Sequence, residues 1–287
     1  MDISAQMVKE LRDQTGAGMM DCKKALTEAA GNFERAVTVL RERGIAKAAS
    51  KEGRTTSEGL IVSHIQPDGK LGVMVEINCE TDFVARTDKF RDFVSAIAKH
   101  VAGSSASDVD GLLNEKTGNG KTVSDLLKET IGSIGENMQI KRFVRFSTDG
   151  QLTNYIHPGD KLGVMVEIAV GSGAAGKDGF RVFARDIAMQ IAATNPLAVT
   201  RDGLDQTMVA KERDILRHQT ENEKKPAAVI DKIVEGRMEK YYSEVVLMEQ
   251  PFVKDNDKTI RDVVAEKVAA LGEPLQVKRF VRFRLGE

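Results

Sequence analysis

The most obvious candidate for ligand chemistry is a glycine-rich stretch, Gly171–Gly176, which reads Gly-Ser-Gly-Ala-Ala-Gly. It matches the G-x-G-x-x-G pattern of dinucleotide-binding loops, in which glycines let the backbone approach a pyrophosphate at the start of a helix. That function requires a parallel βαβ unit, with a second strand ending in an acidic residue about 20 residues further on. The surrounding pattern instead predicts an antiparallel sheet, and no such strand follows. We therefore interpret this stretch as a connecting loop.

The other residues capable of chemistry also lack a functional arrangement. Gly118–Thr122 is similar to a phosphate-binding loop, but Glu115 stands where the first glycine of that motif belongs. The four histidines have no metal-ligand spacing. No serine, cysteine or carboxylate lies in a nucleophile-elbow or zinc-protease motif. The sequence therefore predicts a protein that is not an enzyme and that uses no cofactor or metal.

A third stretch, Glu76–Arg86, places unusual residues at a predicted turn. Alternating apolar residues over Leu71–Ile77 predict a strand before it, and apolar residues at three- and four-residue steps over Phe90–Val101 predict a helix after it. Asp82 and Phe83 fall between the two, where a large apolar ring is unusual. One interpretation is that Phe83 packs under its own helix while Asp82 caps that helix. The other is that Phe83 is exposed and contacts a partner.

Composition limits the class of protein. A length of 287 residues predicts about two domains, and 41% apolar with 30% charged residues is typical of a globular protein. A net charge of −1 gives no case for nucleic acid or an anionic membrane as partner. Cys22 and Cys79 are too few for a disulfide framework, so we expect a cytoplasmic protein. No apolar run reaches 18 residues and no basic-then-apolar leader is present, so we expect neither a membrane span nor a signal peptide.

The N-terminal segment, residues 1–54, predicts a three-helix module followed by a linker. Ser4 can cap the first helix, Thr15–Gly18 breaks the chain before the second, and Gly44 is expected to end the third. Two adjacent methionines at the start of the second helix cannot both point inward, so at least one should be exposed.

The remainder of the chain contains a tandem duplication. Lys70–Ile77 recurs as Lys161–Ile168, and Gln139–Phe146 recurs as Gln276–Phe283. Two near-identical octapeptides in the same order indicate two copies of one unit. Each copy predicts a hairpin, a helix and a late strand, which makes an α+β core with largely antiparallel sheets.

The second copy carries an insertion. The first pair of octapeptides is separated by 91 residues and the second pair by 137, so 46 residues are added in copy two. They fall near 201–245, which predicts a helical hairpin broken at Asn222–Pro226. We expect a protruding coiled-coil arm that could join two copies in a homodimer, which sedimentation would test. The predicted domains are 1–54, 55–147 for copy one, 148–200 with 246–287 for copy two, and the arm at 201–245.

Two long ungapped motifs resemble the signatures of the translation elongation factor Ts family. They are Leu11–Leu26, with Thr-Gly-Ala-Gly-Met-Met-Asp-Cys-Lys-Lys at its centre, and Glu76–Ala85, Glu-Ile-Asn-Cys-Glu-Thr-Asp-Phe-Val-Ala. The resemblance extends over the whole chain, including the three-helix module, the two-part core and the inserted arm. It implies a guanine nucleotide exchange factor that promotes release of GDP and Mg²⁺ from elongation factor Tu.

The resemblance also implies roles for individual residues. In similar proteins an Asp-Phe pair, here Asp82 and Phe83 between Thr81 and Val84, is wedged into the nucleotide domain of the partner. An exposed Phe83 is therefore expected. The other implied contacts with elongation factor Tu are Arg12, Met19, Met20, Ile134, Gly135 and His157.

An alternative function is that of an RNA-binding or ribosome-associated α+β protein. The pattern Lys-Arg-Phe-Val-Arg-Phe, which occurs at Lys141–Phe146 and at Lys278–Phe283, interleaves basic and aromatic residues. The same pattern also suits a sheet strand with solvated basic residues, and the near-neutral net charge weighs against RNA. A salt-dependent gel shift with generic RNA would separate the two functions.

Overall fold

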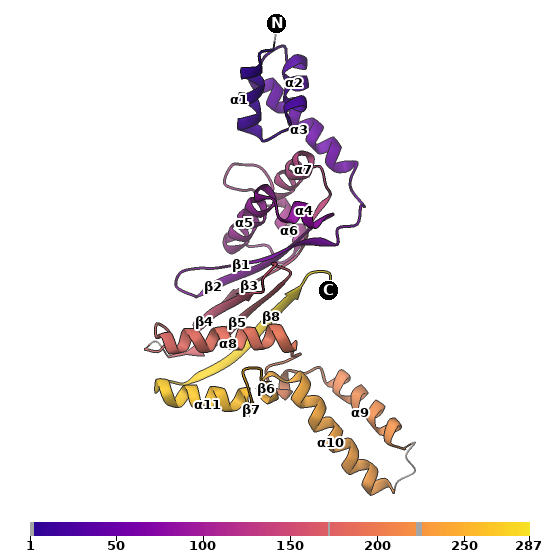
Figure 1. The fold of residues 1–287 in the computed structure, drawn as a ribbon, viewed down its shortest axis with the longest axis vertical. Coiled ribbons are helices and arrows are strands. Elements are labelled where there is room, and N and C mark those ends of the chain that lie inside the picture. The colour runs from indigo at the N-terminus through magenta and orange to yellow at the C-terminus, as the bar shows by residue number, and fades with distance from the viewer. Residues whose placement is uncertain (1–2, 172, 222–225) are drawn as a thin grey trace. The chain divides into compact units, whose positions relative to one another are not determined.

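The protein is described by a computed structural model that covers residues 3–171, 173–221 and 226–287 (Figure 1). The fold is α+β, which confirms the predicted class. The chain divides into two compact units: unit 1 contains Met1–His64, Val73–Arg145 and Arg284–Glu287, and unit 2 contains Ile65–Gly72 and Phe146–Phe283. The finer division into domains stays a prediction. None of the helices in the described part of the chain combines the length and the apolar character that crossing a membrane requires.

Unit 1 begins with three helices, α1 (Ala5–Thr15), α2 (Met19–Glu28) and α3 (Phe33–Ala49). The Ser4 hydroxyl accepts a hydrogen bond from the Met7 N–H at 3.2 Å, which confirms the predicted cap of α1. The three helices share a small hydrophobic core of their own, made by Val8, Leu11, Cys22, Ala25, Leu26, Ala29, Ala36 and Val39.

The third helix does not end at Gly44, so that prediction was wrong. It continues to Ala49 and packs against α7 (Val123–Ile134). The reason is a close approach of two backbones, because a Cβ atom added to Gly132 would lie 2.6 Å from the Cα of Gly44. A Cβ added to Gly44 would meet nothing within 4 Å. The packing of α3 on α7 thus requires a glycine at 132 but not at 44.

We therefore expect opposite effects from two alanine substitutions. Gly132→Ala should lower the free energy of unfolding by about 1–3 kcal/mol, because the new methyl group forces the helices apart. Gly44→Ala should raise it by up to about 1 kcal/mol, because alanine favours a helix interior. Urea denaturation of the full chain measures both, and equal effects would contradict the proposed close packing.

The first sheet has the strand order β1-β2-β3, with β1 (Glu58–Ile65), β2 (Leu71–Cys79) and β3 (Met138–Ser147). Three helices lie next to this sheet in Figure 1: α5 (Asp88–Gly103), α6 (Val109–Asn114) and α7. The apolar side chains predicted to form the inner face of α5 are all buried, namely Phe90, Phe93, Val94, Ile97, Ala98 and Val101. The hydrophobic period therefore correctly predicted the buried face of α5.

Unit 2 repeats this plan, with strand order β4-β5-β8 and with β4 antiparallel to β5. Its core includes apolar residues of β5 and α8, such as Val164, Val166 and Phe183. Its elements are β4 (Gln151–Ile156), β5 (Leu162–Val170), α8 (Asp178–Thr194), β6 (Pro251–Phe252), β7 (Asp255–Thr259), α11 (Ile260–Leu271) and β8 (Leu275–Arg284).

The inserted arm consists of α9 (Gln206–Glu221) and α10 (Ala227–Val245), which run side by side away from the rest of unit 2 (Figure 1). Short 3-10 turns, Arg201–Gly203 and Leu247–Glu249, lie at its base. The Arg201 guanidinium bridges carboxylates from α10 and from the second turn, Glu239 and Glu249, at 2.6 Å each. Of the predicted break at Asn222–Pro226, only Pro226 lies within the described residues. Self-association through the arm stays a prediction.

Candidate functional site

The turn between β2 and α5 exposes one aromatic ring. It is built around α4 (Asp82–Ala85), a helix of a single turn that is capped by Thr81, whose hydroxyl accepts a hydrogen bond from the Val84 N–H at 3.3 Å. This turn directs Ala85 inward and leaves Phe83 78% exposed. Phe83 therefore does not pack under its own helix.

The neighbouring carboxylate is also free of a capping role. The cap of α5 is Thr87, whose hydroxyl accepts from the Phe90 N–H at 3.3 Å. Asp82 instead accepts a hydrogen bond from Arg86 at 2.7 Å, as an exposed pair four residues apart. Such surface pairs contribute only a few tenths of a kcal/mol, so Asp82 can exchange this partner for another at little cost.

A glutamate that the sequence analysis did not identify holds this turn. The carboxylate of Glu136 accepts two hydrogen bonds from Thr81, one from its N–H at 3.0 Å and one from its hydroxyl at 2.7 Å. The adjacent Asn137 donates its backbone N–H to Glu80 at 2.6 Å. The loop after α7 is therefore attached to the turn that carries Phe83. No pattern in the sequence links Glu136 to Thr81, because the two residues are 55 positions apart in the chain.

This attachment brings two predicted site segments together. Ile134 is the last residue of α7, and Gly135 ends the helix in a left-handed conformation with φ of 94°. The exposed Gly135 donates its N–H to Ile131 at 2.8 Å and accepts a hydrogen bond from the Lys51 ammonium through its carbonyl. The segments Thr81–Val84 and Ile134–Gly135 thus belong to one hydrogen-bonded region.

The predicted contacts of the three-helix module lie in the same unit. Arg12, Met19 and Met20 are all exposed. The loop between α1 and α2 is bound to the core at Gly16, whose carbonyl accepts from the Lys89 ammonium at 2.9 Å and from the Ser133 hydroxyl at 3.2 Å. These bonds attach the base of the Arg12–Met20 segment to the start of α5 and the end of α7.

His157, the remaining predicted residue, belongs to unit 2. It is exposed directly after β4. Its Nδ1 lies 3.0 Å from the Tyr155 hydroxyl, and the two rings meet edge to face with their centroids 6.0 Å apart. The Tyr155 contact orients the imidazole on the surface of that unit.

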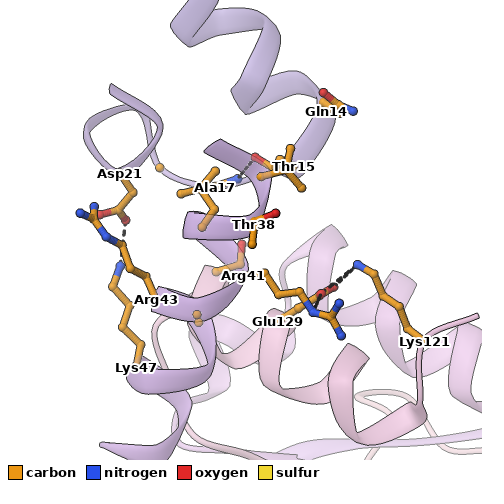
Figure 2. A pocket seen from close by; sticks show the side chains of 16 residues that line it. Gln14, Thr15, Ala17, Asp21, Thr38, Arg41, Arg43, Lys47, Lys121 and Glu129 are labelled. Carbon is orange, nitrogen blue, oxygen red and sulfur yellow. Dashed lines mark hydrogen bonds and ion pairs between the residues drawn. The ribbon is translucent and has the colours of Figure 1, made fainter. Parts of the chain in front are cut away.

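A cavity of roughly 480 Å³ lies between the three-helix module and α7 (Figure 2). Its cationic side chains are already paired. Lys47 pairs with Asp21 at 2.8 Å and Lys121 with Glu129 at 2.6 Å. Arg41 pairs with Asp125 at 3.2 Å and Arg43 with Glu28. These pairs neutralise the cations that could otherwise bind an anion. The cavity therefore offers no evident site for a phosphate.

The thiol of Cys79, which lies next to this turn, is unreactive. Cys79 is fully buried at the end of β2, and its thiol donates to the Thr81 carbonyl at 3.2 Å. Burial raises its pKa to about 12, so it stays protonated at neutral pH and is a poor nucleophile. Among the residues that the structure describes, no group of three or more His, Cys, Asp or Glu side chains could hold a metal ion. What this region offers is a contact surface centred on an exposed ring.

Comparison with known proteins identifies close relatives. The model of a family described as Elongation factor TS matches residues 80–287. The chain is 49% identical to a protein named Elongation factor Ts from Clostridium botulinum over 288 residues, which span 99% of this chain and 93% of the relative. It is 48% identical over 286 residues to one from Clostridium perfringens, and 45% identical over 288 residues to one from Clostridium novyi, with the same two shares covered.

Proposed function

Because this chain belongs to the elongation factor Ts family, we propose that it releases GDP and Mg²⁺ from elongation factor Tu by inserting Asp82 and Phe83 as a wedge into the nucleotide domain of that GTPase. Family membership implies nucleotide exchange on elongation factor Tu. The wedge is the finer part of the proposal, which the resemblance of Glu76–Ala85 to a family signature suggested. The observation that carries it is the 78% exposure of Phe83 on a capped and hydrogen-bonded turn. An exposed phenylalanine forgoes roughly 1.5–3 kcal/mol of burial free energy, which a partner surface would recover.

The physical requirement explains why a wedge would be needed. A nucleotide bound at nanomolar affinity, with an association rate constant of about 10⁶ M⁻¹s⁻¹, dissociates at about 10⁻³ s⁻¹, which is far too slow for repeated delivery of aminoacyl-tRNA. An exchange factor must bind the empty GTPase more tightly than the loaded one. A 10⁴-fold preference corresponds to about 5.5 kcal/mol, and linkage weakens GDP by the same factor.

A wedge inserted near the Mg²⁺ site of the GTPase would turn the free energy of binding the exchange factor into weaker binding of GDP. Much of the affinity for GDP in such a site comes from the phosphate-binding loop and Mg²⁺. A ring that pushes apart the helices behind the metal would remove both contributions at once. We propose further contacts with elongation factor Tu through Thr81 and Val84 beside the wedge, and through Arg12, Met19, Met20, Ile134, Gly135 and His157.

The test is release of labelled GDP from purified elongation factor Tu. We expect this chain at saturating concentration to accelerate release by about 100-fold or more, because stabilisation of the empty state weakens GDP binding through linkage. Excess unlabelled GDP prevents rebinding, and heat-denatured chain is the control. An unchanged release rate would rule out exchange activity.

The RNA-binding alternative receives less support. In both copies of Lys-Arg-Phe-Val-Arg-Phe the first arginine is occupied by a carboxylate, with Arg142 paired to Glu76 at 2.7 Å and Arg279 to Glu167 at 2.5 Å. A guanidinium held in this way is less available to a phosphate. The gel shift with generic RNA remains the experiment that would revive this function.

A further inference from the structure

We propose that Glu136 is a positioning residue of the exchange reaction: it fixes the direction of Phe83 by holding the cap of α4, without itself needing to contact the partner. This inference rests on the proposed function of Asp82 and Phe83. It follows from the hydrogen bonds around Thr81, which is 55 residues away from Glu136 in the chain.

The geometry gives both oxygens of Glu136 to one residue. Oε2 accepts from the Thr81 N–H at 3.0 Å, and Oε1 accepts from its hydroxyl at 2.7 Å. Because the hydroxyl proton is committed to Glu136, an oxygen lone pair of the same group points back to accept from the Val84 N–H at 3.3 Å. Glu136 therefore selects the Thr81 side-chain orientation that caps α4.

This cap matters because α4 is only four residues long. A single helical turn fixes several backbone angles for one or two hydrogen bonds and is unstable without outside support. Without Glu136, Thr81 could rotate away and the turn could open. Phe83 would then sample several directions, and the free energy of ordering it would have to come from binding to the partner.

Glu136 is itself held in place. The next residue, Asn137, donates its backbone N–H to Glu80 at 2.6 Å and its side-chain amide to the Arg54 carbonyl at 2.9 Å. The preceding residue, Gly135, accepts from Lys51. Both neighbours of Glu136 are thus anchored, which leaves its carboxylate in a defined position beneath the turn.

The duplication supplies a matched control. Glu273 stands 137 residues after Glu136, at the corresponding place in copy two. Its carboxylate also lies against the loop that follows the second strand of its copy, since a Cβ added to Gly173 would lie 2.9 Å from Oε1 of Glu273. That loop carries no threonine cap and no phenylalanine. Glu273→Ala therefore removes an equivalent carboxylate without touching the wedge.

The experiment measures GDP release from elongation factor Tu against the concentration of wild-type chain, Glu136→Ala, Glu136→Gln and Glu273→Ala. For Glu136→Ala we expect the maximal rate to fall about three- to tenfold, as for loss of one or two hydrogen bonds, while the half-saturating concentration changes less than threefold. Glu136→Gln keeps one acceptor oxygen and should recover part of the rate. Glu273→Ala should match the wild type.

The same substitution made in the Phe83→Ala protein shows whether Glu136 acts by positioning the wedge or only by stabilising the fold. Once Phe83 is alanine, only Asp82 is left for the turn to position, so Glu136→Ala should cause a clearly smaller loss of maximal rate in Phe83→Ala than in the wild type. A loss of equal size in both backgrounds would overturn the proposal, as would a normal maximal rate for Glu136→Ala. If Glu136→Ala does not fold, the isosteric Glu136→Gln decides by the same criteria. Failure of the wild-type chain to release GDP would instead overturn the proposed function.

Discussion

Replacing Phe83 by alanine is expected to slow catalysed GDP release at least about tenfold, which corresponds to a loss of about 1.4 kcal/mol in the transition state. The melting temperature should change little, because the ring is 78% exposed and makes a small contribution to the core. Truncation of a buried phenylalanine would instead cost about 3–5 kcal/mol of stability. One thermal melt and one release trace distinguish the two outcomes.

Two further variants serve as controls for this prediction. Asp82→Ala should give a smaller exchange defect, because it removes a polar contact and no apolar volume. Val182→Ala removes an exposed apolar side chain from α8 in unit 2 and should leave exchange unchanged. If the Phe83→Ala protein melts many degrees lower, yet accelerates GDP release normally while it is folded, then Phe83 stabilises the fold and is not a wedge.

Replacing Arg142 by alanine is expected to destabilise the protein by about 3–5 kcal/mol, because it leaves the charge of Glu76 buried without its partner. The Glu76 side chain is only 1% exposed and accepts from Arg142 at 2.7 Å. Within unit 1 the same guanidinium also donates to the carbonyl of Arg284 at 3.0 Å. Urea denaturation of the full chain measures the loss.

The duplicated copy again provides the comparison. In unit 2, Arg279 pairs with Glu167 at 2.5 Å and donates to the carbonyl of Ser147 at 3.2 Å, but the Glu167 side chain is 15% exposed. Water can therefore solvate Glu167 once Arg279 is removed, and Arg279→Ala should cost only about 1–2 kcal/mol. Adding Glu76→Gln to Arg142→Ala should recover stability, because it removes the buried charge. Equal losses in the two copies would contradict the role of burial.

The sequence by itself determined the features that depend on local chain chemistry. Its repeated octapeptides revealed the duplicated α+β core, and the surplus spacing located the arm. The apolar period over Phe90–Val101 identified the buried face of α5, and Ser4 marked the start of α1. These signals are readable because side-chain direction repeats with the period of a helix or strand, and because a cap lies within a few residues of the N–H group that it satisfies. Similarity of the motifs also led to the family.

Only the tertiary structure decided how distant segments affect one another. The third helix passes through Gly44 because Gly132, 88 residues later, leaves room for its backbone. The sequence allows Phe83 to be either packed under its own helix or exposed. In the structure it is exposed, on a turn that Glu136, in the loop after α7, holds by hydrogen bonds. Such contacts depend on which surfaces meet after folding, and they leave no period in the chain. Their energies come from close packing and from hydrogen bonds between segments far apart in the sequence, which local propensity cannot encode.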